Sequence, residues 1–104
     1  MAELLTKENF DEFIKSNKIV LVDFFNDGCV PCKRISPIID KLEPEFEDKV
    51  KFAKIKVAGS LNIAMKYAVE SVPTLLLFTD GEASYRHMGT ADENQIRELL
   101  SKAE

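Results

Sequence analysis

The stretch IVLVDFFNDGCVPCK, residues 19–33, carries the chain's only two cysteines, Cys29 and Cys32, directly after a strand-like apolar run. The segment from Pro31 onward reads as a helix, so the two thiols lie on one side of its first turn, close enough for a disulfide. A disulfide that closes so short a loop removes little conformational entropy from the unfolded chain and so adds little stability. A redox-active role therefore suits this bond better than a structural one. The placement therefore indicates a redox site, with two inert buried thiols as the alternative.

Length and composition limit the classes of protein to which this chain can belong. At 104 residues the chain has a common domain size, and we expect a single domain over residues 1–104. Hydrophobic residues make up 45% and charged residues 31%, and no apolar stretch is long enough to span a membrane. Residues 1–5 lack the features of a signal peptide, so we expect a cytoplasmic protein. The net charge of −4, without a basic cluster, argues against nucleic acid as a partner.

A metal site is the first alternative to redox chemistry. In a reducing compartment, two cysteines favour a catalytic or metal-binding role over a structural bridge. A closed zinc site needs about four Cys, His or carboxylate ligands. The chain offers two thiols and one histidine, His87, which we interpret as an ordinary strand residue. We therefore expect no metal, and a zinc half-site completed by a dimer stays as the alternative.

Hydrophobic periodicity predicts alternating helices and strands. The predicted helices cover 6–16, 31–46, 61–68 and 92–102, and the predicted strands cover 19–25, 50–57, 74–79 and 83–88. We expect Thr6 to cap the first helix, Pro37 to kink the second, and Thr90 with Glu93 to form a capping box before the last. Asp80-Gly81 predicts a hairpin turn. The element order predicts an α/β fold, with a mixed, mainly four-stranded sheet and helices on both faces.

Several short motifs match one known family in type and spacing. They are Leu21-Val22-Asp23-Phe24 before the cysteines, Pro31-Cys32-Lys33 at the helix start, Pro37 within that helix, Ser71-Val72-Pro73-Thr74-Leu75, and Gly89. On these residues the chain resembles the thioredoxin family over essentially its whole length. The resemblance implies the thioredoxin fold, in which a short fifth strand at the N-terminus can join the four-stranded sheet.

The chain departs from the family pattern beside the cysteines. Thioredoxins usually carry Trp-Cys-Gly-Pro-Cys, whereas this chain has Gly28-Cys29-Val30-Pro31-Cys32 and no tryptophan. Phe25 stands at another position where the family commonly has Trp. Both thiols are retained, so the redox centre survives. The change bears on partner recognition, because an indole that would form part of the docking surface is absent.

Four side chains are the catalytic candidates: Cys29, Cys32, Asp23 and Lys54. Cys29 is the expected attacking thiol, because the N-terminus of a helix favours a thiolate, and Cys32 then resolves the mixed disulfide. Asp23 lies among apolar strand neighbours, where an unpaired carboxylate is costly, so its pKa is expected to rise. The resemblance places Asp23 beneath the cysteines as the acceptor of the Cys32 proton, with Lys54 as a tuning cation. A structural ion pair between Asp23 and Lys54 is the alternative.

Pro73 lies at the start of a predicted strand. Proline has no backbone N–H to donate to a neighbouring strand, so its presence at this position calls for an explanation. The resemblance implies a cis Val72–Pro73 bond, with the ring against the disulfide and the Val72 backbone free to pair with an extended substrate. A trans edge proline is the alternative. The expected substrate-binding surface comprises Gly28, Val30, Pro31, Val72, Pro73, Thr74, Met88 and Gly89.

The resemblance implies a protein-disulfide reductase and electron carrier that works by reversible dithiol–disulfide exchange. It also implies disulfide-containing substrate proteins, a thioredoxin reductase as electron donor, a monomeric state, and no cofactor beyond the Cys29–Cys32 disulfide. A disulfide oxidase or isomerase is the first alternative, although proline before Cys32 and the lack of a histidine between the cysteines favour reduction. A glutaredoxin fits less well, because its proline usually follows the first cysteine directly. A non-enzymatic binding subunit, which would tolerate loss of both cysteines, is the remaining alternative.

Overall fold

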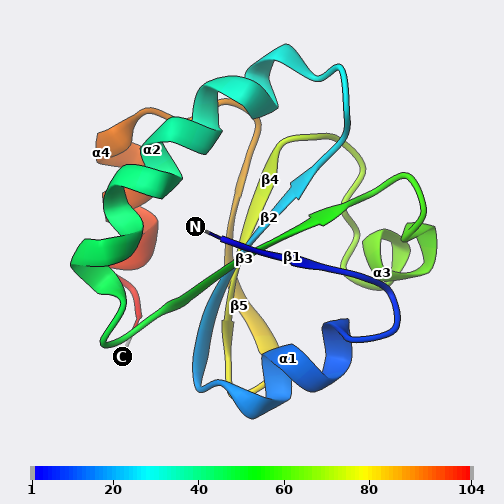
Figure 1. Ribbon diagram of the computed structural model, residues 1–104, viewed down its shortest axis with the longest axis horizontal. Helices are drawn as coiled ribbons and strands as arrows, with labels where there is room; N and C mark the ends of the chain where they lie inside the picture. The colour runs from blue at the N-terminus through cyan, green and yellow to red at the C-terminus, as the bar shows by residue number, and fades with distance from the viewer. Residues whose placement is uncertain (1, 104) are drawn as a thin grey trace.

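The computed structural model describes residues 2–103, which form five strands and four helices (Figure 1). In chain order they are β1 (Glu3–Leu5), α1 (Phe10–Ser16), β2 (Ile19–Phe25), α2 (Val30–Phe46), β3 (Lys51–Lys56), α3 (Leu61–Lys66), β4 (Thr74–Thr79), β5 (Glu82–Met88) and α4 (Glu93–Leu100). The strands form one sheet in the order β1-β3-β2-β4-β5. β3 is parallel to β1 and β2, whereas β4 is antiparallel to β2 and β5. The predicted mixed sheet is confirmed.

β1 is the short fifth strand at the edge of the sheet. It pairs with β3, so that Leu5 lies opposite Ile55, and both side chains are buried. Three residues are too few to display the alternation by which periodicity identifies a strand. Pairing with β3, and not the local sequence pattern, therefore defines this element.

Helices cover both faces of the sheet and create two hydrophobic cores. On one face, α1 and α3 contribute Phe10 and Ile63 to the core. On the other face, α2 and α4 contribute Leu42 and Ile96. Figure 1 shows α2 beside α4 on one side of the sheet, with α1 and α3 on the other. The central strand β2 sends alternate side chains into both cores, which explains its continuous apolar run.

Two predicted helix caps are wrong. Thr6 does not cap α1; residues 6–9 form a turn in which Asn9 Oδ1 accepts the Thr6 N–H (2.8 Å), and the helix begins at Phe10. Before α4, Asp92 and Gln95 form the capping box, in place of Thr90 and Glu93. Both pairs have capping-box spacing. The path of the chain after β5 decides between them, because only Asp92 stands at the N-cap with an extended backbone.

Other boundaries lie close to the prediction, and their differences have local causes. α2 continues without interruption through Pro37, and the kink expected there stays a prediction. Asp80 and Gly81 have φ values of 52° and 84°, the left-handed conformation that a two-residue hairpin turn requires. α3 ends at Lys66, two residues early, because Ala68 adopts a left-handed φ of 55°. Across residues 2–103, no helix has both the length and the apolar character needed to span a membrane.

Candidate redox site

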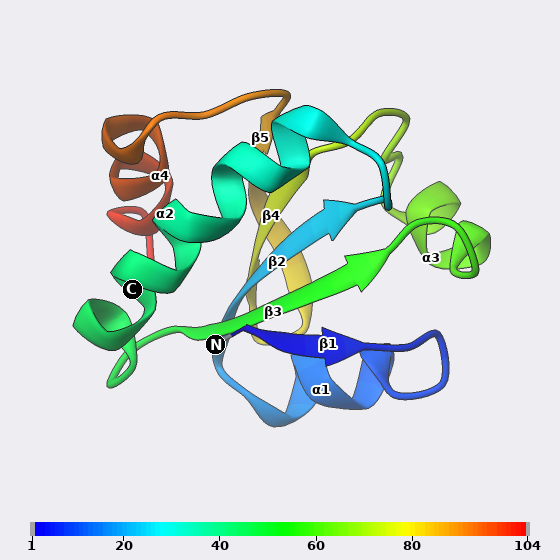
Figure 2. The same cartoon turned by 45° about the horizontal axis from the view of Figure 1, so that its top comes forward.

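The predicted catalytic residues gather at the carboxyl ends of β2 and β3. The chain leaves β2 for α2 on one face of the sheet and leaves β3 for α3 on the other (Figure 2). Neighbouring parallel strands whose connections diverge in this way open a crevice at their carboxyl ends, where α/β proteins place their ligands. A cavity of about 250 Å³ lies here, and Asp23, Cys32 and Lys54 all line it.

Cys29 and Cys32 form a disulfide across the first turn of α2, with their Cα atoms 5.2 Å apart. Cys29 is the N-cap of this helix, and its Sγ accepts the backbone N–H of Cys32 at 3.2 Å. Its side chain is half-buried, whereas Cys32 is only 3% exposed. The first turn of α2 holds no acidic residue, so the positive end of the helix dipole acts on Cys29 unopposed from its own helix. Cys29 is therefore the more accessible of the two cysteines.

Asp23 is a buried acid in the wall of the cavity. Its side chain is 4% exposed, and its Oδ1 has no hydrogen-bond partner within residues 2–103. Burial raises its pKa from 3.8 to about 7, although the positive charge of Lys54 acts in the opposite direction. Desolvation therefore outweighs the attraction of Lys54. A carboxyl group with this pKa exchanges protons at neutral pH.

Lys54 interacts with Asp23 through its charge and not through a close ion pair. The two residues are register partners on β3 and β2, yet no salt bridge within 4.0 Å joins them in the described part of the chain. The Lys54 ammonium lies 5.7 Å from the centre of the Phe25 ring. This geometry disfavours the structural ion pair and leaves Lys54 as a nearby cation.

The predicted docking residues lie on three neighbouring segments: residues 28–31, 72–74 and 88–89. The Val72–Pro73 bond is cis, and the Pro73 carbonyl accepts the N–H of Gly89 at 2.8 Å. Thr74 pairs with Phe24 at the end of β2, so the loop before β4 lies beside the loop that carries the cysteines, as Figures 1 and 2 both show. At this end of the molecule Val30 is 56% exposed and Met88 is 65% exposed. Two apolar side chains are therefore available to a partner.

Sequence reasoning missed several residues that line the cavity. They are Phe25, Asn26, Asp27, Lys33 and Ser36. Their position directly after a buried strand could have identified Asn26 and Asp27, because polar side chains there lie at the carboxyl edge of the sheet, where α/β proteins bind ligands. Ser36 lies one turn beyond Cys32 on α2 and donates to the Cys32 carbonyl at 3.2 Å, so helical spacing predicts its proximity.

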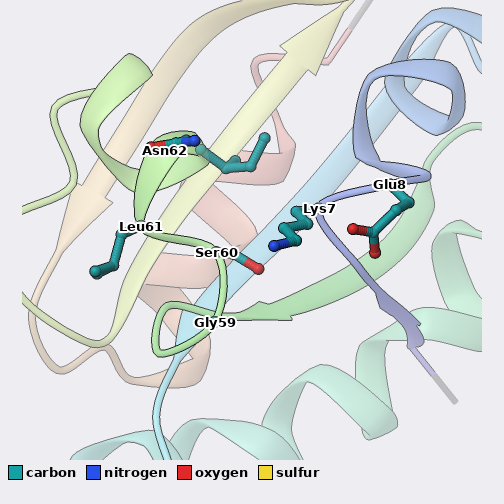
Figure 3. A pocket seen from close by; sticks show the side chains of 7 residues that line it. Lys7, Glu8, Gly59, Ser60, Leu61 and Asn62 are labelled. Carbon is teal, nitrogen blue, oxygen red and sulfur yellow. The ribbon is translucent and has the colours of Figure 1, made fainter.

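A larger cavity, of about 680 Å³, lies between the loop before α1 and the start of α3 (Figure 3). Figure 3 shows the Lys7 and Ser60 side chains facing one another across it. None of the predicted redox residues lines it. We assign this cavity no role in the redox chemistry.

Histidine and acidic side chains make no metal cluster in the described region. No group of three or more His, Cys, Asp or Glu residues there is arranged to hold a metal ion. The His87 Nε2 lies 2.8 Å from the Thr90 carbonyl oxygen, a local bond near the end of β5. His87 therefore has a structural partner.

Comparison with known proteins agrees with this geometry. The sequence profile of the Thioredoxin family matches residues 1–102. The chain is 36% identical to a thioredoxin of Rickettsia felis over 104 residues, which cover 99% of each protein. It is 37% identical to a thioredoxin of Chlamydia trachomatis over 102 residues, or 98% of each. A solved structure of a mutant thioredoxin from Halobacterium salinarum matches with a TM-score of 0.89 and 31% identity, over 98% of this chain and 89% of that one.

These matches span nearly the full length of both partners, so the fold and the family follow together. The five-stranded sheet with two helices on each face is the thioredoxin fold, as the resemblance implied. The cysteine pair supplies the dithiol–disulfide function of such proteins. By sequence, fold and redox centre, this chain belongs to the thioredoxin family of disulfide oxidoreductases.

Proposed function

We propose that this protein is a protein-disulfide reductase and electron carrier. One observation carries the proposal: an accessible Cys29 at the N-terminus of α2 is paired with a buried Cys32 that shares a cavity with Asp23. This arrangement separates an attacking thiol from a resolving thiol and supplies an acid–base group to the second. The two thiols and the carboxyl group are the chemistry that reduction requires, without a bound cofactor.

In the first step, the Cys29 thiolate attacks one sulfur of a target disulfide. A mixed disulfide forms between Cys29 and the target, and the other target sulfur leaves as a thiolate. The free N–H groups at the start of α2, including that of Cys32, stabilise the Cys29 thiolate. A thiolate populated near neutral pH without being a weak nucleophile is the favourable case for exchange.

In the second step, Cys32 resolves the mixed disulfide. Asp23 accepts the Cys32 proton through a water molecule, which a polar cavity of about 250 Å³ can hold. The Cys32 thiolate attacks Cys29, the Cys29–Cys32 disulfide forms, and the second target sulfur leaves. The two electrons of the dithiol have then passed to the target. Lys54 tunes Asp23, because its positive charge limits the rise of the Asp23 pKa.

The target docks on the three neighbouring segments around the disulfide, residues 28–31, 72–74 and 88–89. Val30 and Met88 supply apolar contacts, and the Val72 backbone pairs with an extended segment of the substrate. The remaining docking residues are Gly28, Pro31, Pro73, Thr74 and Gly89. A thioredoxin reductase returns the protein to the dithiol state. We place the cycle in the cytoplasm and expect the protein to act as a monomer.

Insulin reduction with dithiothreitol as the electron donor tests the proposal. We expect the unaltered protein to accelerate the reaction, Cys29→Ser to abolish the acceleration, and Cys32→Ser to accumulate a mixed disulfide that gel electrophoresis detects. A reduction potential near −270 mV, the value established for thioredoxins, fits a reducing carrier. A potential above about −200 mV would indicate an oxidase or isomerase instead. Full insulin-reducing activity of the Cys29→Ser variant would contradict the proposed mechanism.

A further inference from the structure

The loop of residues 26–28 joins β2 to Cys29, and Asp27 and Gly28 in it are exposed. Gly28, the residue before Cys29, is exposed and has a φ of +75°, a conformation that favours glycine. Apart from Gly28 itself and its two chain neighbours, no residue has a heavy atom within 4 Å of the place where a Cβ would stand. The residue next to the attacking thiol therefore contributes no side-chain contact that holds the loop.

Three contacts tie this region to the end of β3 and to the segment that follows it. The Phe25 carbonyl accepts the Val57 N–H at 2.9 Å, which extends the ladder between β2 and β3 by one bond. The Asn26 Oδ1 accepts the Ala58 N–H at 2.8 Å. Asp27 follows β2 and pairs with Lys56, the last residue of β3, at 2.9 Å. All three connect the two strand ends between which the crevice opens.

These contacts differ in the constraint that they impose on residues 26–28. The Phe25 bond belongs to the sheet and precedes the loop. The Asp27–Lys56 pair has side chains that are 80% and 44% exposed, and such ion pairs contribute little. The Asn26 bond is also solvent-exposed, but it joins a half-buried side chain directly to a backbone N–H at 2.8 Å and does not require two long charged side chains to be held in place. Asn26 is therefore the main anchor of the loop itself.

The anchor matters differently in the two redox states. In the disulfide state, the Cys29–Cys32 bond fixes Cys29 to the first turn of α2. In the dithiol state this covalent link is absent, and the position of Cys29 depends on α2 and on the loop before it. The thiolate is stabilised only while its sulfur stays near the free N–H groups of the helix. A loose loop therefore weakens the dithiol state more than the disulfide state.

We propose that Asn26 is a positioning residue, which anchors the loop to Ala58 and so holds Cys29 at the N-terminus of α2 when the disulfide is open. The inference rests on the proposed function, because it concerns the reduced form that attacks the substrate. Asn26 touches neither the substrate nor the reacting sulfurs in this role. It acts through the backbone that leads to Cys29.

The test compares Asn26→Ala with two related variants. Asn26→Asp keeps an oxygen that can accept the Ala58 N–H, and about 0.5 M salt screens its added charge. Lys56→Ala removes the exposed ion pair of the same loop and leaves the Asn26 bond intact. For each variant we would measure the reduction potential against a known dithiol couple and the urea stability of both the disulfide and the dithiol forms.

For Asn26→Ala we expect the equilibrium constant for reduction to fall roughly three- to tenfold, a shift of about 14 to 30 mV toward a more negative potential. The dithiol form should lose more stability than the disulfide form, Asn26→Asp should recover most of the loss, and Lys56→Ala should change little. Equal losses in both forms with an unchanged potential would assign Asn26 a merely structural role. The same shift in Lys56→Ala would also overturn the inference. Insulin reduction by the unaltered protein, measured in parallel, tests the proposed function separately.

Discussion

At the scale of single residues, Asp23 links the redox chemistry to stability. The carboxyl group is buried beside Cys32, and burial raises its pKa from 3.8 to about 7. The folded state therefore keeps this proton in a pH range where the unfolded state has released it. Asp23 consequently lowers the stability as the pH rises from about 3.8 to 7, and the loss persists at higher pH. Since one pKa unit corresponds to about 1.4 kcal/mol, the full loss is about 4 kcal/mol as an upper bound.

Asp23→Asn should remove this pH-dependent loss. At pH 8 we expect the disulfide form of the variant to be more stable than the unaltered protein by up to about 4 kcal/mol. Near pH 3 the gain should nearly vanish, because Asp23 is then mostly protonated in both states. Urea unfolding at both pH values checks this, with the exposed Asp27→Asn as the control. An identical difference at both pH values would contradict the proposed cost of burying the charge.

The same variant addresses the second catalytic step. Without an acid–base group in the cavity, Cys32 should lose its proton more slowly, and the mixed disulfide with Cys29 should persist. Trapping by rapid acid quench measures its lifetime. If Asp23→Asn were more stable yet resolved the mixed disulfide as fast as the unaltered protein, Asp23 would have no role in proton transfer.

At the scale of elements, the start of α4 depends on one of two similar sequence patterns. Asp92 accepts the Gln95 N–H at 2.8 Å, and Gln95 accepts the Asp92 N–H at 2.9 Å. Asp92→Ala should therefore lower the free energy of unfolding by about 1 kcal/mol. Thr90→Ala, at the residue that the sequence pattern favoured, should change it by only a few tenths. Thermal unfolding of the two variants makes the comparison, and a larger loss from Thr90→Ala would contradict the observed cap.

The turn that follows α3 contains a backbone conformation that its residue, Ala68, disfavours. Ala68 has a φ of 55°, and the Arg86 guanidinium donates to its carbonyl at 3.2 Å. Glycine adopts this conformation freely, whereas an L-residue there costs about 1–2 kcal/mol. Ala68→Gly should therefore raise the melting temperature, by the equivalent of about 0.5–1 kcal/mol after the greater entropy of glycine in the unfolded chain is included.

A matched alanine in a strand supplies the control for that prediction. Ala83 lies on β5, where the backbone is extended and a glycine only weakens the strand. Ala83→Gly should lower the melting temperature while Ala68→Gly raises it. If both variants shifted the melting temperature in the same direction, the left-handed conformation of Ala68 would not explain the effect of Ala68→Gly.

At the scale of the whole molecule, four aromatic rings join the elements of one core. The ring of Phe10 on α1 lies 6.1 Å from Phe24, 5.8 Å from Tyr67 and 5.7 Å from Phe78, measured between centroids. These distances fall within the favourable range for aromatic pairs. Phe10 is fully buried, so its ring connects α1 to β2, β4 and the end of α3.

Phe10→Ala should therefore lower the free energy of unfolding by about 3–5 kcal/mol. This is a large share of the roughly 5–15 kcal/mol that stabilises a typical domain. Phe13 lies on the same helix but is only partly buried, so Phe13→Ala should cost distinctly less. Urea unfolding of the two variants tests the comparison. Equal losses would mean that the ring cluster adds nothing specific at Phe10.

Short-range physics explains what could be predicted from the sequence. The apolar run of β2, the Cys29–Cys32 spacing and the Asp80-Gly81 turn depend on neighbours a few residues apart, and the structure contains all three. The apolar neighbours of Asp23 were also sufficient to predict the direction of its pKa change. Together with the motifs shared with a known family, these features indicated the α/β fold and the redox centre.

The family resemblance implied the short N-terminal strand and placed Asp23 and Lys54 near the cysteines, but local sequence patterns do not determine such features, which join distant segments. β1 exists because it pairs with β3, and the capping box of α4 depends on the path of the chain after β5. The cavity unites Asp23 of β2, Lys54 of β3 and Cys32 of α2, and the bond from Ala58 to Asn26 crosses 32 positions. Periodicity and propensity describe which element a segment forms, but not which distant side chains it meets. Those contacts depend on how the helices pack against the two faces of the sheet.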